Sequence, residues 1–368
     1  MNYQMDSDTD AQEQPEELPL GVPSDATNSA AHDKSMAMRD VLQLENRKKE
    51  VTEIIKRFDF EALGDLFREA MEQMEESEPQ LKDDLDYEGD WGLQTVDAER
   101  CLFDKKRTEL FKNAIESVVH SGDTVLEANV SPGDVVVEAG AGTGILALIA
   151  AVKGAKKVYA VEINPNTVRV CNQFIKFCGF EGTIEVIHGD ATTFVPPEKV
   201  DVIMSENMYT GLLEEPQQQI MNNLLQHLKS GGRVVPKKLE SFIELVEAPD
   251  EQAKSKVRRE LSDAINIVSD PEKYDDVSFE KQEPLDLDTR VTIKANKDAT
   301  INAVNISSLI YLTDDIRIKR DECDFLGNDE VIYLNEPVTV EQGKQYSIHI
   351  RYNGGDKSKD ALIEVEAV

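Results

Sequence analysis

The sequence predicts an α/β protein with a doubly wound, Rossmann-like parallel sheet, preceded by a helical extension and followed by an antiparallel, barrel-like β domain. Two observations support this fold. Between residues 134 and 236, short apolar runs alternate with helical segments, as in a parallel sheet built from βαβ units. After Lys237 apolar and polar side chains alternate residue by residue, which is typical of antiparallel strands with one buried face.

We divide the chain of 368 residues into five parts by composition and pattern. Residues 1–35 are rich in acids, Pro, Ser and Thr, which cannot bury a core, and we expect a disordered acidic tail there. Residues 36–78 place apolar side chains at helical spacing and are expected to form the helical extension. We expect an acidic linker at 79–100, the Rossmann-like domain at 101–236 and the β domain at 237–368.

The composition is strongly acidic. Lys and Arg together number 40 against 72 Asp and Glu, so the formal net charge is −32. Such a surface repels phosphate backbones, so a nucleic-acid partner is not expected, and it attracts cationic partners. Adaptation to a salty cytoplasm would give the same composition and is the alternative explanation.

Cysteine usage and hydropathy bound the class of protein. The sequence has four cysteines and no CxxC pair, so we expect neither a metal site nor a disulfide framework. It has no run of 18 apolar residues and no signal peptide. We therefore expect a soluble, cytoplasmic protein with no membrane segment.

The stretch from Asp134 to Glu162 organises the predicted parallel sheet. It reads strand, glycine-rich turn, helix, strand and acid, in the segments Asp134–Ala139, Gly140–Gly144, Ile145–Val152, Lys157–Val161 and Glu162. Gly154 follows the helix as its C-terminal stop. This order is that of a nucleotide-binding βαβ unit.

The spacing of the glycines narrows the choice of nucleotide. Gly140, Gly142 and Gly144 form a GxGxG pattern, whereas dinucleotide folds use GxGxxG so that a pyrophosphate can lie on the helix N-terminus. A turn of bare backbone lets a ligand lie close, and the carboxylate of Glu162 can accept hydrogen bonds from both ribose hydroxyls. The pattern favours S-adenosyl-L-methionine as the cofactor, with NAD, or a glycine turn that binds nothing, as the alternatives.

The alternation continues to the end of the predicted sheet. The expected segments are a helix from Asn164 to Cys178, strands at Thr183–Ile187 and Val200–Ser205, a helix from Glu214 to Leu228 stopped by residues 229–232, and a strand at Arg233–Pro236. Ligands of such sheets lie at the carboxyl ends of the strands. Glu162, Asp190 and Glu206 all stand at these ends.

Two further segments carry candidate functional side chains. Ahead of the glycine turn, one helix is expected from Cys101 to Val118, with Asp104 and Arg107 on one face. After the fourth strand, Glu206 and Glu215 bracket a hairpin-sized loop. Two carboxylates can hold a planar guanidinium through paired, charge-assisted hydrogen bonds, so this loop favours a cationic acceptor.

These motifs resemble those of the protein arginine methyltransferases. The resemblance covers about residues 100–368 and rests on Leu102–Thr108, Glu138–Leu146, Val158–Glu162, the spacing of nine between Glu206 and Glu215, and the barrel-like Tyr333–Gln345. It implies an S-adenosylmethionine-dependent methyltransferase with a Rossmann-like domain followed directly by a barrel. Glu206 and Glu215 would clamp the guanidinium of a cationic protein substrate.

The resemblance also implies roles for single residues. The cofactor site would comprise Arg107, Glu138, Gly140, Gly142, Gly144, Glu162 and Asp190. Within it, Arg107 would pair with the methionine carboxylate, Glu162 with the ribose and Asp190 with the adenine. The methyl group would pass in line to one guanidinium nitrogen, and a proton would leave through Glu215 or Asp104.

The chain departs from this family at several positions. The family's Thr-His-Trp loop should fall near Phe325-Leu326-Gly327, which cannot replace it. Asn207 stands where the family has a tryptophan, and Tyr87 and Trp91 are the best match to its tyrosine-rich cofactor lid. The resemblance implies a homodimer built through an arm, for which the helical-looking Glu251–Val268 is the candidate.

Other functions remain open at this point. Methylation of another amine, in a small molecule or a different protein side chain, is the main alternative to an arginine acceptor. RNA methylation is a weaker alternative because of the negative charge. A non-catalytic scaffold that binds partners and keeps a vestigial cofactor site is the third.

Overall fold

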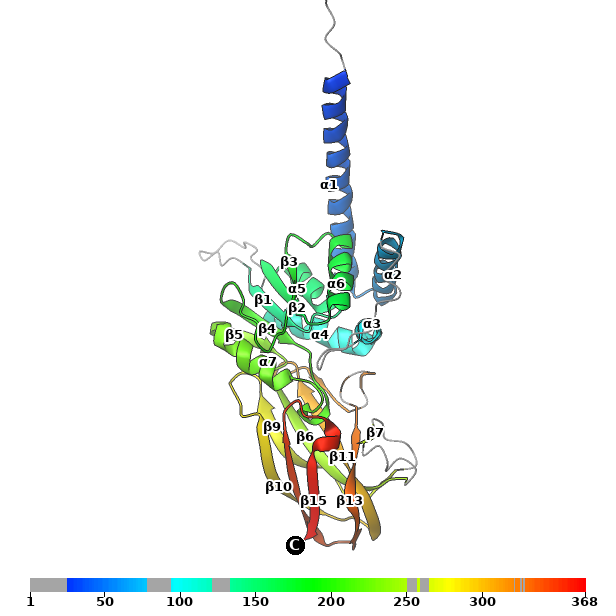
Figure 1. Ribbon diagram of the computed structural model, residues 1–368, viewed down its shortest axis with the longest axis vertical. Helices are drawn as coiled ribbons and strands as arrows, with labels where there is room; N and C mark the ends of the chain where they lie inside the picture. The colour runs from blue at the N-terminus through cyan, green and yellow to red at the C-terminus, as the bar shows by residue number, and fades with distance from the viewer. Residues whose placement is uncertain are drawn as a thin grey trace, which may run out of the picture. The chain divides into compact units, whose positions relative to one another are not determined.

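The computed structural model describes residues 25–77, 94–120, 133–249, 257–258, 265–320, 322–324, 326 and 328–368. The chain divides into two compact units, Met1–Asn46 and Arg47–Val368. Helix α1 (Asp25–Arg57) begins in the first unit and ends in the second. Figure 1 labels most of the helices and strands of the chain.

A five-stranded parallel sheet forms the centre of the predicted Rossmann-like domain. Its strands are β1 (Val135–Ala139), β2 (Lys157–Glu162), β3 (Ile184–His188), β4 (Val200–Ser205) and β5 (Leu228–Val235), in the spatial order β3-β2-β1-β4-β5. All its strand pairings are parallel, which confirms the prediction. The strand order reverses between β1 and β4, and ligands of such sheets bind in the crevice at that point.

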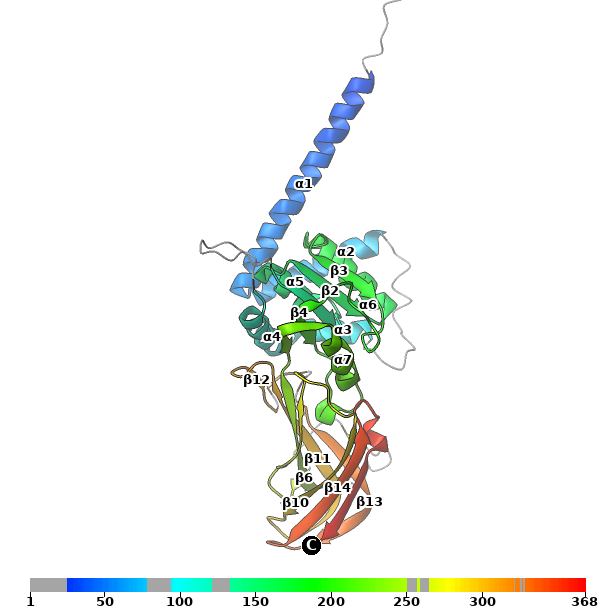
Figure 2. The ribbon, with the colours of Figure 1, turned by 90° about the vertical axis from the view of Figure 1, so that its left-hand side faces the viewer.

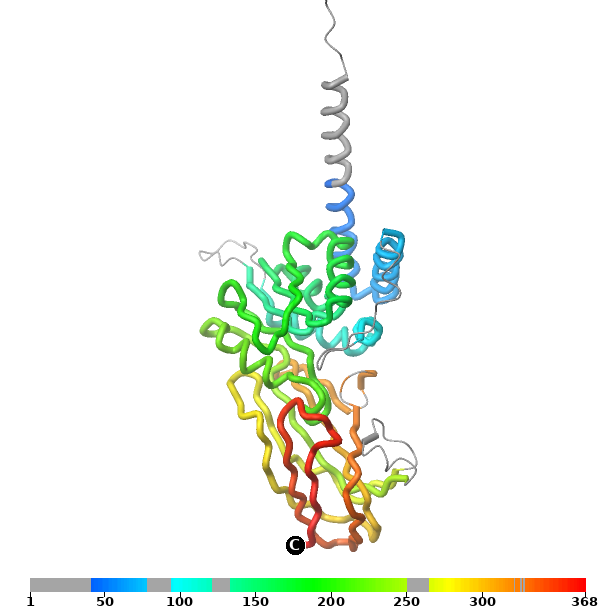
Figure 3. The backbone as a smooth tube through the Cα atoms, in the orientation of Figure 1, coloured from blue at the N-terminus to red at the C-terminus, as the bar shows by residue number. Residues whose placement is uncertain are grey.

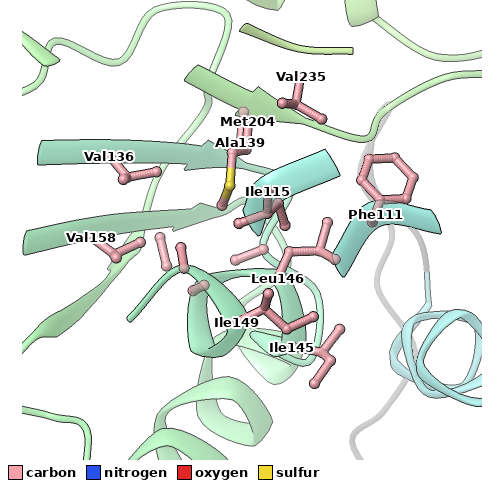
Figure 4. Packing of buried hydrophobic residues seen from close by; sticks show 14 of the residues in the cluster. Phe111, Ile115, Val136, Ala139, Ile145, Leu146, Ile149, Val158, Met204 and Val235 are labelled. Carbon is pink, nitrogen blue, oxygen red and sulfur yellow. The ribbon is translucent and has the colours of Figure 1, made fainter. Parts of the chain in front are cut away.

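Helices surround this sheet, as Figure 2 shows. They are α3 (Thr95–Phe103), α4 (Lys105–Val118), α5 (Ile145–Lys153), α6 (Pro165–Phe177) and α7 (Gln217–Leu224), and α2 (Phe60–Ser77) packs against α6. Because crossovers between parallel strands are right-handed, α5 and α6 lie on one face of the sheet and α7 on the other. Ile145, Leu146 and Ile149 of α5 pack with Val136 and Val158 of the sheet in one buried apolar cluster (Figure 4).

The ends of α5 and α6 follow from their local sequence. Gly144 and Gly154 flank α5 with φ angles of 83° and 110°, in the left-handed region that glycine adopts readily. Asn164 precedes α6, and its side chain accepts hydrogen bonds from the N–H groups of Asn166 and Thr167, while Pro165 occupies the first turn. The predicted βαβ unit is thus confirmed down to its capping residues.

An antiparallel domain follows the parallel sheet directly, and Figure 3 lets the backbone be traced from one into the other. Its strands are β6 (Lys238–Glu247), β7 (Val257–Arg258), β8 (Asn266–Ile267), β9 (Glu272–Ser278), β10 (Asp286–Lys294), β11 (Ala299–Tyr311), β12 (Arg317–Ile318), β13 (Glu330–Val340), β14 (Gln345–Asn353) and β15 (Leu362–Ala367). Three of them pair in the order β10-β14-β15 and the rest form a larger sheet around β6 and β11. Apolar side chains of both sheets, including Ile243, Ile306 and Ile348, share one core, as expected for a barrel-like domain.

The single helix expected from Cys101 to Val118 is in fact two helices. Helix α3 ends at Phe103, α4 begins at Lys105, and Asp104 lies between them in an extended conformation. The Asp104 carboxylate accepts a hydrogen bond from the N–H of Arg107 at 2.9 Å, so this residue caps α4. Residues 95–100, which were expected to belong to an acidic linker, form the first part of α3.

Other boundaries also differ from the predictions. The helix expected from Glu214 to Leu228 is reduced to α7 and one short 3₁₀ turn, and residues 229–232, expected to be a helix stop, belong to β5. Helix α1 begins at Asp25, inside the segment expected to be disordered. In the candidate arm Glu251–Val268, the described residues include the strands β7 and β8, and none of them is helical. Tyr87 and Trp91 lie outside the described residues.

The division into five parts stays a prediction. The two compact units meet between Asn46 and Arg47, and this boundary does not test those of the five parts. Among the described residues, no helix combines the length and the apolar character that a membrane span needs.

Gly144→Ala should lower the free energy of unfolding by about 2–5 kcal/mol. Alanine in the left-handed region costs about 1–2 kcal/mol, and overpacking adds about 1–3 kcal/mol. The overpacking arises because the new Cβ would lie 2.7 Å from Cys171 Sγ and 3.2 Å from Ile175 Cδ1. Urea unfolding followed by circular dichroism measures the loss.

The matched control is Gly343→Ala, at a glycine with a φ of +84° beside the +83° of Gly144. No atom lies within 4 Å of its added Cβ, so only the backbone cost of about 1–2 kcal/mol should remain. Equal losses in the two variants would show that the contact with Cys171 relaxes without cost.

Candidate functional site

A cavity of about 550 Å³ lies at the carboxyl ends of the parallel strands and extends to the β domain. Its volume falls within the usual range of small-molecule sites. Among the predicted site residues, Arg107, Glu138, Gly140, Gly142, Glu162, Asp190, Glu206 and Glu215 line it. Gly144 and Asp104 do not. Most of the predicted site is therefore brought together in one place.

The glycine turn forms one wall of the cavity. The N–H groups of Gly140 and Ala141 both donate to the carbonyl of Val161, which ties the turn to β2. A Cβ at Gly140 would meet the amide group of Asn207 at 2.2 Å, so only glycine lets this close approach occur. Gly144, by contrast, faces the core beside Cys171 and shapes the start of α5.

Glu162 stands at the end of β2 with 7% of its surface exposed. One carboxylate oxygen accepts from the N–H of Gly142 and the other from the N–H of Asn164, each at 2.9 Å. Burial raises the pKa of Glu162, although these two amides lower it. Each carboxylate oxygen can accept a second hydrogen bond, so Glu162 keeps acceptor capacity for a ligand hydroxyl.

Asp190 lies in the loop after β3 and is half-buried. A single oxygen, Oδ1, accepts from both the N–H and the hydroxyl of Thr192, at 2.8 and 2.7 Å. This arrangement fixes the carboxylate and leaves Oδ2 without a partner among the described residues. Asp190 can therefore accept one further hydrogen bond from a donor in the cavity.

Glu138 is the most deeply buried acid of the cavity, with 1% of its surface exposed. Neither carboxylate oxygen has a partner in hydrogen-bonding geometry among the described residues. Burial raises the pKa of Glu138 well above its usual value, and the nearby amide of Ala147 and the charge of Arg107 only partly oppose this. A buried polar group without a partner is costly, which suggests that a ligand supplies one.

Arg107 and Glu206 form a buried ion pair across the cavity wall. Arg107 Nε lies 3.1 Å from Glu206 Oε2, Nη2 contacts the same oxygen, and only 5% and 10% of the two side chains are exposed. Arg107 Nη1 also donates to the carbonyl of Cys101, and its guanidinium lies 5.3 Å from the ring centre of Phe111. Burial raises the pKa of Glu206, and the charge of Arg107 opposes that shift.

This pairing was not foreseen. Arg107 was expected to bind a cofactor carboxylate, and Glu206 a substrate guanidinium. In the structure, the guanidinium of Arg107 binds the carboxylate of Glu206 instead. A guanidinium is therefore already seated on one of the two glutamates predicted to bind one.

Asp104 lies outside the lining of the cavity and is 2% exposed. One of its oxygens caps α4 and the other accepts from the N–H of Asp324 at 2.7 Å. Asp324 belongs to the loop in which the missing histidine was expected. Through this bond Asp104 links the start of α4 to the loop after β12.

The loop between β4 and α7 carries the second predicted glutamate, Glu215. Gly211, Leu212 and Glu214 have φ angles of 67°, 57° and 61°, a left-handed conformation that costs a non-glycine residue about 1–2 kcal/mol. Glu214 points to the β domain, where its carboxylate accepts from the N–H of Ser358 and pairs with Lys357 at 3.3 Å. Of the two adjacent glutamates, Glu214 is held by the β domain through these bonds.

Gln217 is a residue that sequence reasoning missed. It is fully buried at the start of α7, and its Oε1 accepts from the Ser205 hydroxyl and from the N–H of Asn207, both at 3.0 Å. It thereby fixes the first residues of the loop between β4 and α7, residues 206–216, which we call the glutamate loop. The only signal in the sequence is a glutamine directly after Glu215-Pro216, which predicts nothing by itself.

Comparisons with known proteins support a methyltransferase. Residues 95–235 match the model of the TRM5/TYW2 methyltransferase domain. The chain is 35% identical to the uncharacterized protein MJ1452 of Methanocaldococcus jannaschii over 264 residues, which are 69% of this chain and 91% of that protein.

Two arginine methyltransferases match shorter segments. The chain is 39% identical to Protein arginine N-methyltransferase 6 of Danio rerio over 107 residues, 28% of this chain and 30% of that protein. It is 30% identical to Probable protein arginine N-methyltransferase 6 of Arabidopsis thaliana over 161 residues, 43% of this chain and 34% of that protein. The chain spans about a third of the length of these two curated relatives.

A solved structure, the Trypanosoma brucei PRMT1 enzyme-prozyme heterotetrameric complex with AdoHcy, has the same fold. Its TM-score is 0.60 at 17% identity, and the match covers 73% of this chain and 92% of that chain. With the domain match, the relatives and the cavity, the chain is a class I S-adenosylmethionine-dependent methyltransferase that resembles the protein arginine methyltransferases.

Glu138→Gln should make the protein more stable against unfolding at pH 8, and this gain should vanish as the pH falls to about 4.5. The folded state keeps the Glu138 proton to a higher pH than the unfolded chain, whose carboxyl has a pKa of 4.5. Above that pH the folded state binds more protons, so the stability of the wild type falls as pH rises. Urea unfolding at a series of pH values measures the difference between variant and wild type.

Glu185→Gln serves as the control, because it removes one negative charge from a half-exposed side chain on β3 that pairs with Lys157. A difference between Glu138→Gln and wild type that stays constant over this pH range would contradict the burial argument.

Proposed function

We propose that this protein, which belongs to the same family as the uncharacterized protein MJ1452 of Methanocaldococcus jannaschii, methylates a guanidinium nitrogen of a cationic protein substrate. The observation that carries the proposal is the buried pairing of a guanidinium, that of Arg107, with Glu206. Glu215 lines the same cavity, and the similar segments of the arginine methyltransferases add support. The acidic composition suits a cationic partner.

The residues of the cavity fit the cofactor. The bare turn at Gly140 and Gly142 gives it close access to backbone, Glu162 has acceptor capacity for ribose hydroxyls and Asp190 for the adenine amine. Buried Glu138 lacks a partner that a ligand could supply. S-adenosylmethionine, when bound, supplies a methyl group on a positively charged sulfur.

Arg107 would hold the carboxylate of the cofactor's amino-acid part. Its guanidinium has five N–H donors, of which Nε and Nη2 now serve Glu206 and Nη1 serves the Cys101 carbonyl. A second carboxylate at Arg107 would share these donors and weaken the pairing with Glu206. Glu206 would then be available to the guanidinium of the acceptor.

Glu206 and Glu215 would orient the acceptor together. An arginine side chain is protonated at neutral pH and is a poor nucleophile. Two carboxylates that bind it through charge-assisted hydrogen bonds hold one nitrogen in line with the methyl donor, and such positioning accounts for most of the rate. We assign the departing proton to Glu215, because Asp104 does not line the cavity.

Another amine is the second candidate acceptor. Among the described residues, Leu326 and no histidine line the cavity near the position expected for the Thr-His-Trp loop of the arginine methyltransferases. An acidic cavity suits a lysine side chain or a small cationic amine as well as arginine. The solved Trypanosoma brucei neighbour is a heterotetrameric complex, and we propose that this chain also forms an oligomer. The resemblance to the arginine methyltransferases favours a homodimer.

Arg107→Gln should weaken S-adenosylmethionine binding by about 10- to 100-fold, the worth of a hydrogen bond to a charged group. Binding of 5′-methylthioadenosine, which lacks the carboxylate, should change by no more than about twofold. Isothermal titration calorimetry measures both affinities.

The double variant Arg107→Gln/Glu206→Gln is the control, because the single variant leaves Glu206 without its partner. It should show the same contrast between the two ligands. If the variants weaken the binding of both ligands equally, Arg107 does not hold the cofactor's carboxylate.

Glu206→Gln and Glu215→Gln should each lower methyl transfer to an arginine-rich peptide by at least about 100-fold. This is the scale of a misplaced reacting group for Glu206 and of a lost proton acceptor for Glu215. The assay follows labelled methyl from S-adenosylmethionine, with a peptide in which every arginine is replaced by lysine run in parallel. Transfer to arginine alone supports the proposal, and transfer to lysine alone favours the second candidate.

Glu116→Gln is the control, because Glu116 is a partly buried glutamate that pairs with Lys112 on α4, outside the cavity. If Glu206→Gln and Glu215→Gln are as active as this control, the two glutamates do not clamp the acceptor. If wild-type protein binds the cofactor and methylates no protein, peptide or small amine, the result supports a scaffold that keeps a vestigial cofactor site.

A further inference from the structure

The short segment from Gly211 to Glu214 has a conformation that its own sequence does not favour. Gly211, Leu212 and Glu214 all have positive φ angles, and two of the three are not glycine. Such residues persist only where the surrounding structure forces them, and they cluster at functional sites. The next residue along the chain is Glu215, so the conformation of this segment sets where that carboxylate lies.

The end of β14 and the turn that follows it hold each of these three residues. The Tyr352 hydroxyl donates to the carbonyl of Gly211 at 2.7 Å, and the N–H of Gly355 donates to the carbonyl of Leu212 at 2.8 Å. The N–H of Glu214 donates to the carbonyl of Asp356 at 2.8 Å. All of the strained residues thus depend on one segment of the β domain.

Tyr352 is itself fixed by a second tyrosine. The hydroxyls of Tyr352 and Tyr274 lie 3.0 Å apart, and both side chains are buried, with 6% and 8% of their surface exposed. The carbonyl of Gly211 can only accept, so the proton of Tyr352 points to it, and the Tyr352 oxygen accepts from Tyr274. Burial raises the pKa of both phenols, so both donors stay protonated over the ordinary pH range.

The tyrosine pair also packs directly on the loop. A Cβ at Gly211 would lie 2.9 Å from the Tyr274 hydroxyl oxygen and 3.2 Å from Ile306 Cγ2. The N–H of Gly211 donates to the Ser308 hydroxyl of β11 at 3.0 Å. The backbone of Gly211 is therefore fixed at both its donor and its acceptor by side chains of the β domain.

We propose that Tyr352, supported by Tyr274, is a positioning residue that sets the place of Glu215 through the left-handed segment Gly211–Glu214. This inference rests on the proposed function, in which Glu215 binds the acceptor. Tyr352 is not among the described residues that line the large cavity, whereas the glycine turn and Glu162 do line it. Its loss should therefore change turnover of the acceptor and leave cofactor binding as it is.

Tyr352→Phe tests the proposal, because it keeps the ring and removes only the hydroxyl. Tyr346→Phe is a closely matched control on the same strand. Tyr346 is 3% exposed, packs in the same core, and its hydroxyl bonds the N–H of Glu341 at 2.8 Å, in the turn between β13 and β14. Each variant loses one hydroxyl of a buried β14 tyrosine, but only Tyr352 bonds the glutamate loop.

We expect Tyr352→Phe to lower kcat for an arginine-rich peptide by about 10- to 100-fold, since small displacements of reacting groups cost that much. Tyr346→Phe should keep kcat within about twofold of wild type. Both variants should bind S-adenosylhomocysteine as the wild type does. Equal kcat values for the two variants would overturn the proposal, and so would a loss of cofactor affinity in Tyr352→Phe that accounts for the fall in rate.

Hydrogen exchange of the peptide that covers residues 206–216 gives a readout that needs no activity. Exchange there should be faster in Tyr352→Phe than in wild type and unchanged in Tyr346→Phe, because the loop amides lose their fixed geometry. If the wild type methylates no arginine peptide, the proposed function fails while this measurement still decides the positioning role. Unchanged exchange in Tyr352→Phe overturns it.

Should Tyr352→Phe not fold, Tyr274→Phe replaces it. This variant removes only the hydroxyl that donates to Tyr352 and should show the same pattern, a lower kcat, faster exchange in residues 206–216 and unchanged cofactor affinity. Kinetics and exchange equal to those of Tyr346→Phe would overturn the proposal.

Discussion

The buried ion pair between Arg107 and Glu206 is the constraint on which the architecture of the cavity depends. Removing two charges from water costs several kcal/mol per ion, so each must meet its partner in good geometry. Asp104 ends one helix and starts the next, which lets Arg107 reach β4, while the Cys101 carbonyl satisfies another of its donors. Two segments that lie far apart in the sequence are thereby fixed to each other beside the cofactor turn.

The parts of the fold that follow from short-range chemistry could be predicted. The glycine turn, the buried helix behind it and the cap at Asn164 are all encoded within a few residues, and the structure has them as expected. The break at Asp104 could not be predicted, because apolar spacing runs on from α3 into α4. The break becomes evident only in the structure, where the Asp104 carboxylate accepts a hydrogen bond from the N–H of Arg107.

The partners of the site residues were harder to predict for a different reason. Asp104 meets the backbone N–H of Asp324, and the Gly211 carbonyl meets Tyr352 across the fold. Any residue except proline offers a backbone N–H, so the identity of residue 324 does not indicate this contact. The resemblance to arginine methyltransferases located the charged side chains of the cavity, but the backbone groups that hold them depend on how the two domains pack.

The contacts between the glutamate loop and the turn after β14 bear on how such a protein could arise and be subdivided. A chain ending at Pro236 would keep the glycine turn, Glu162 and Asp190, since their bonds lie within the parallel domain. It would lose the groups that hold Gly211 to Glu214. The bonds that fix the cofactor turn thus lie within the parallel domain, whereas those that fix the segment before Glu215 come from the β domain. The β domain is therefore better regarded as half of the enzyme than as an accessory to it.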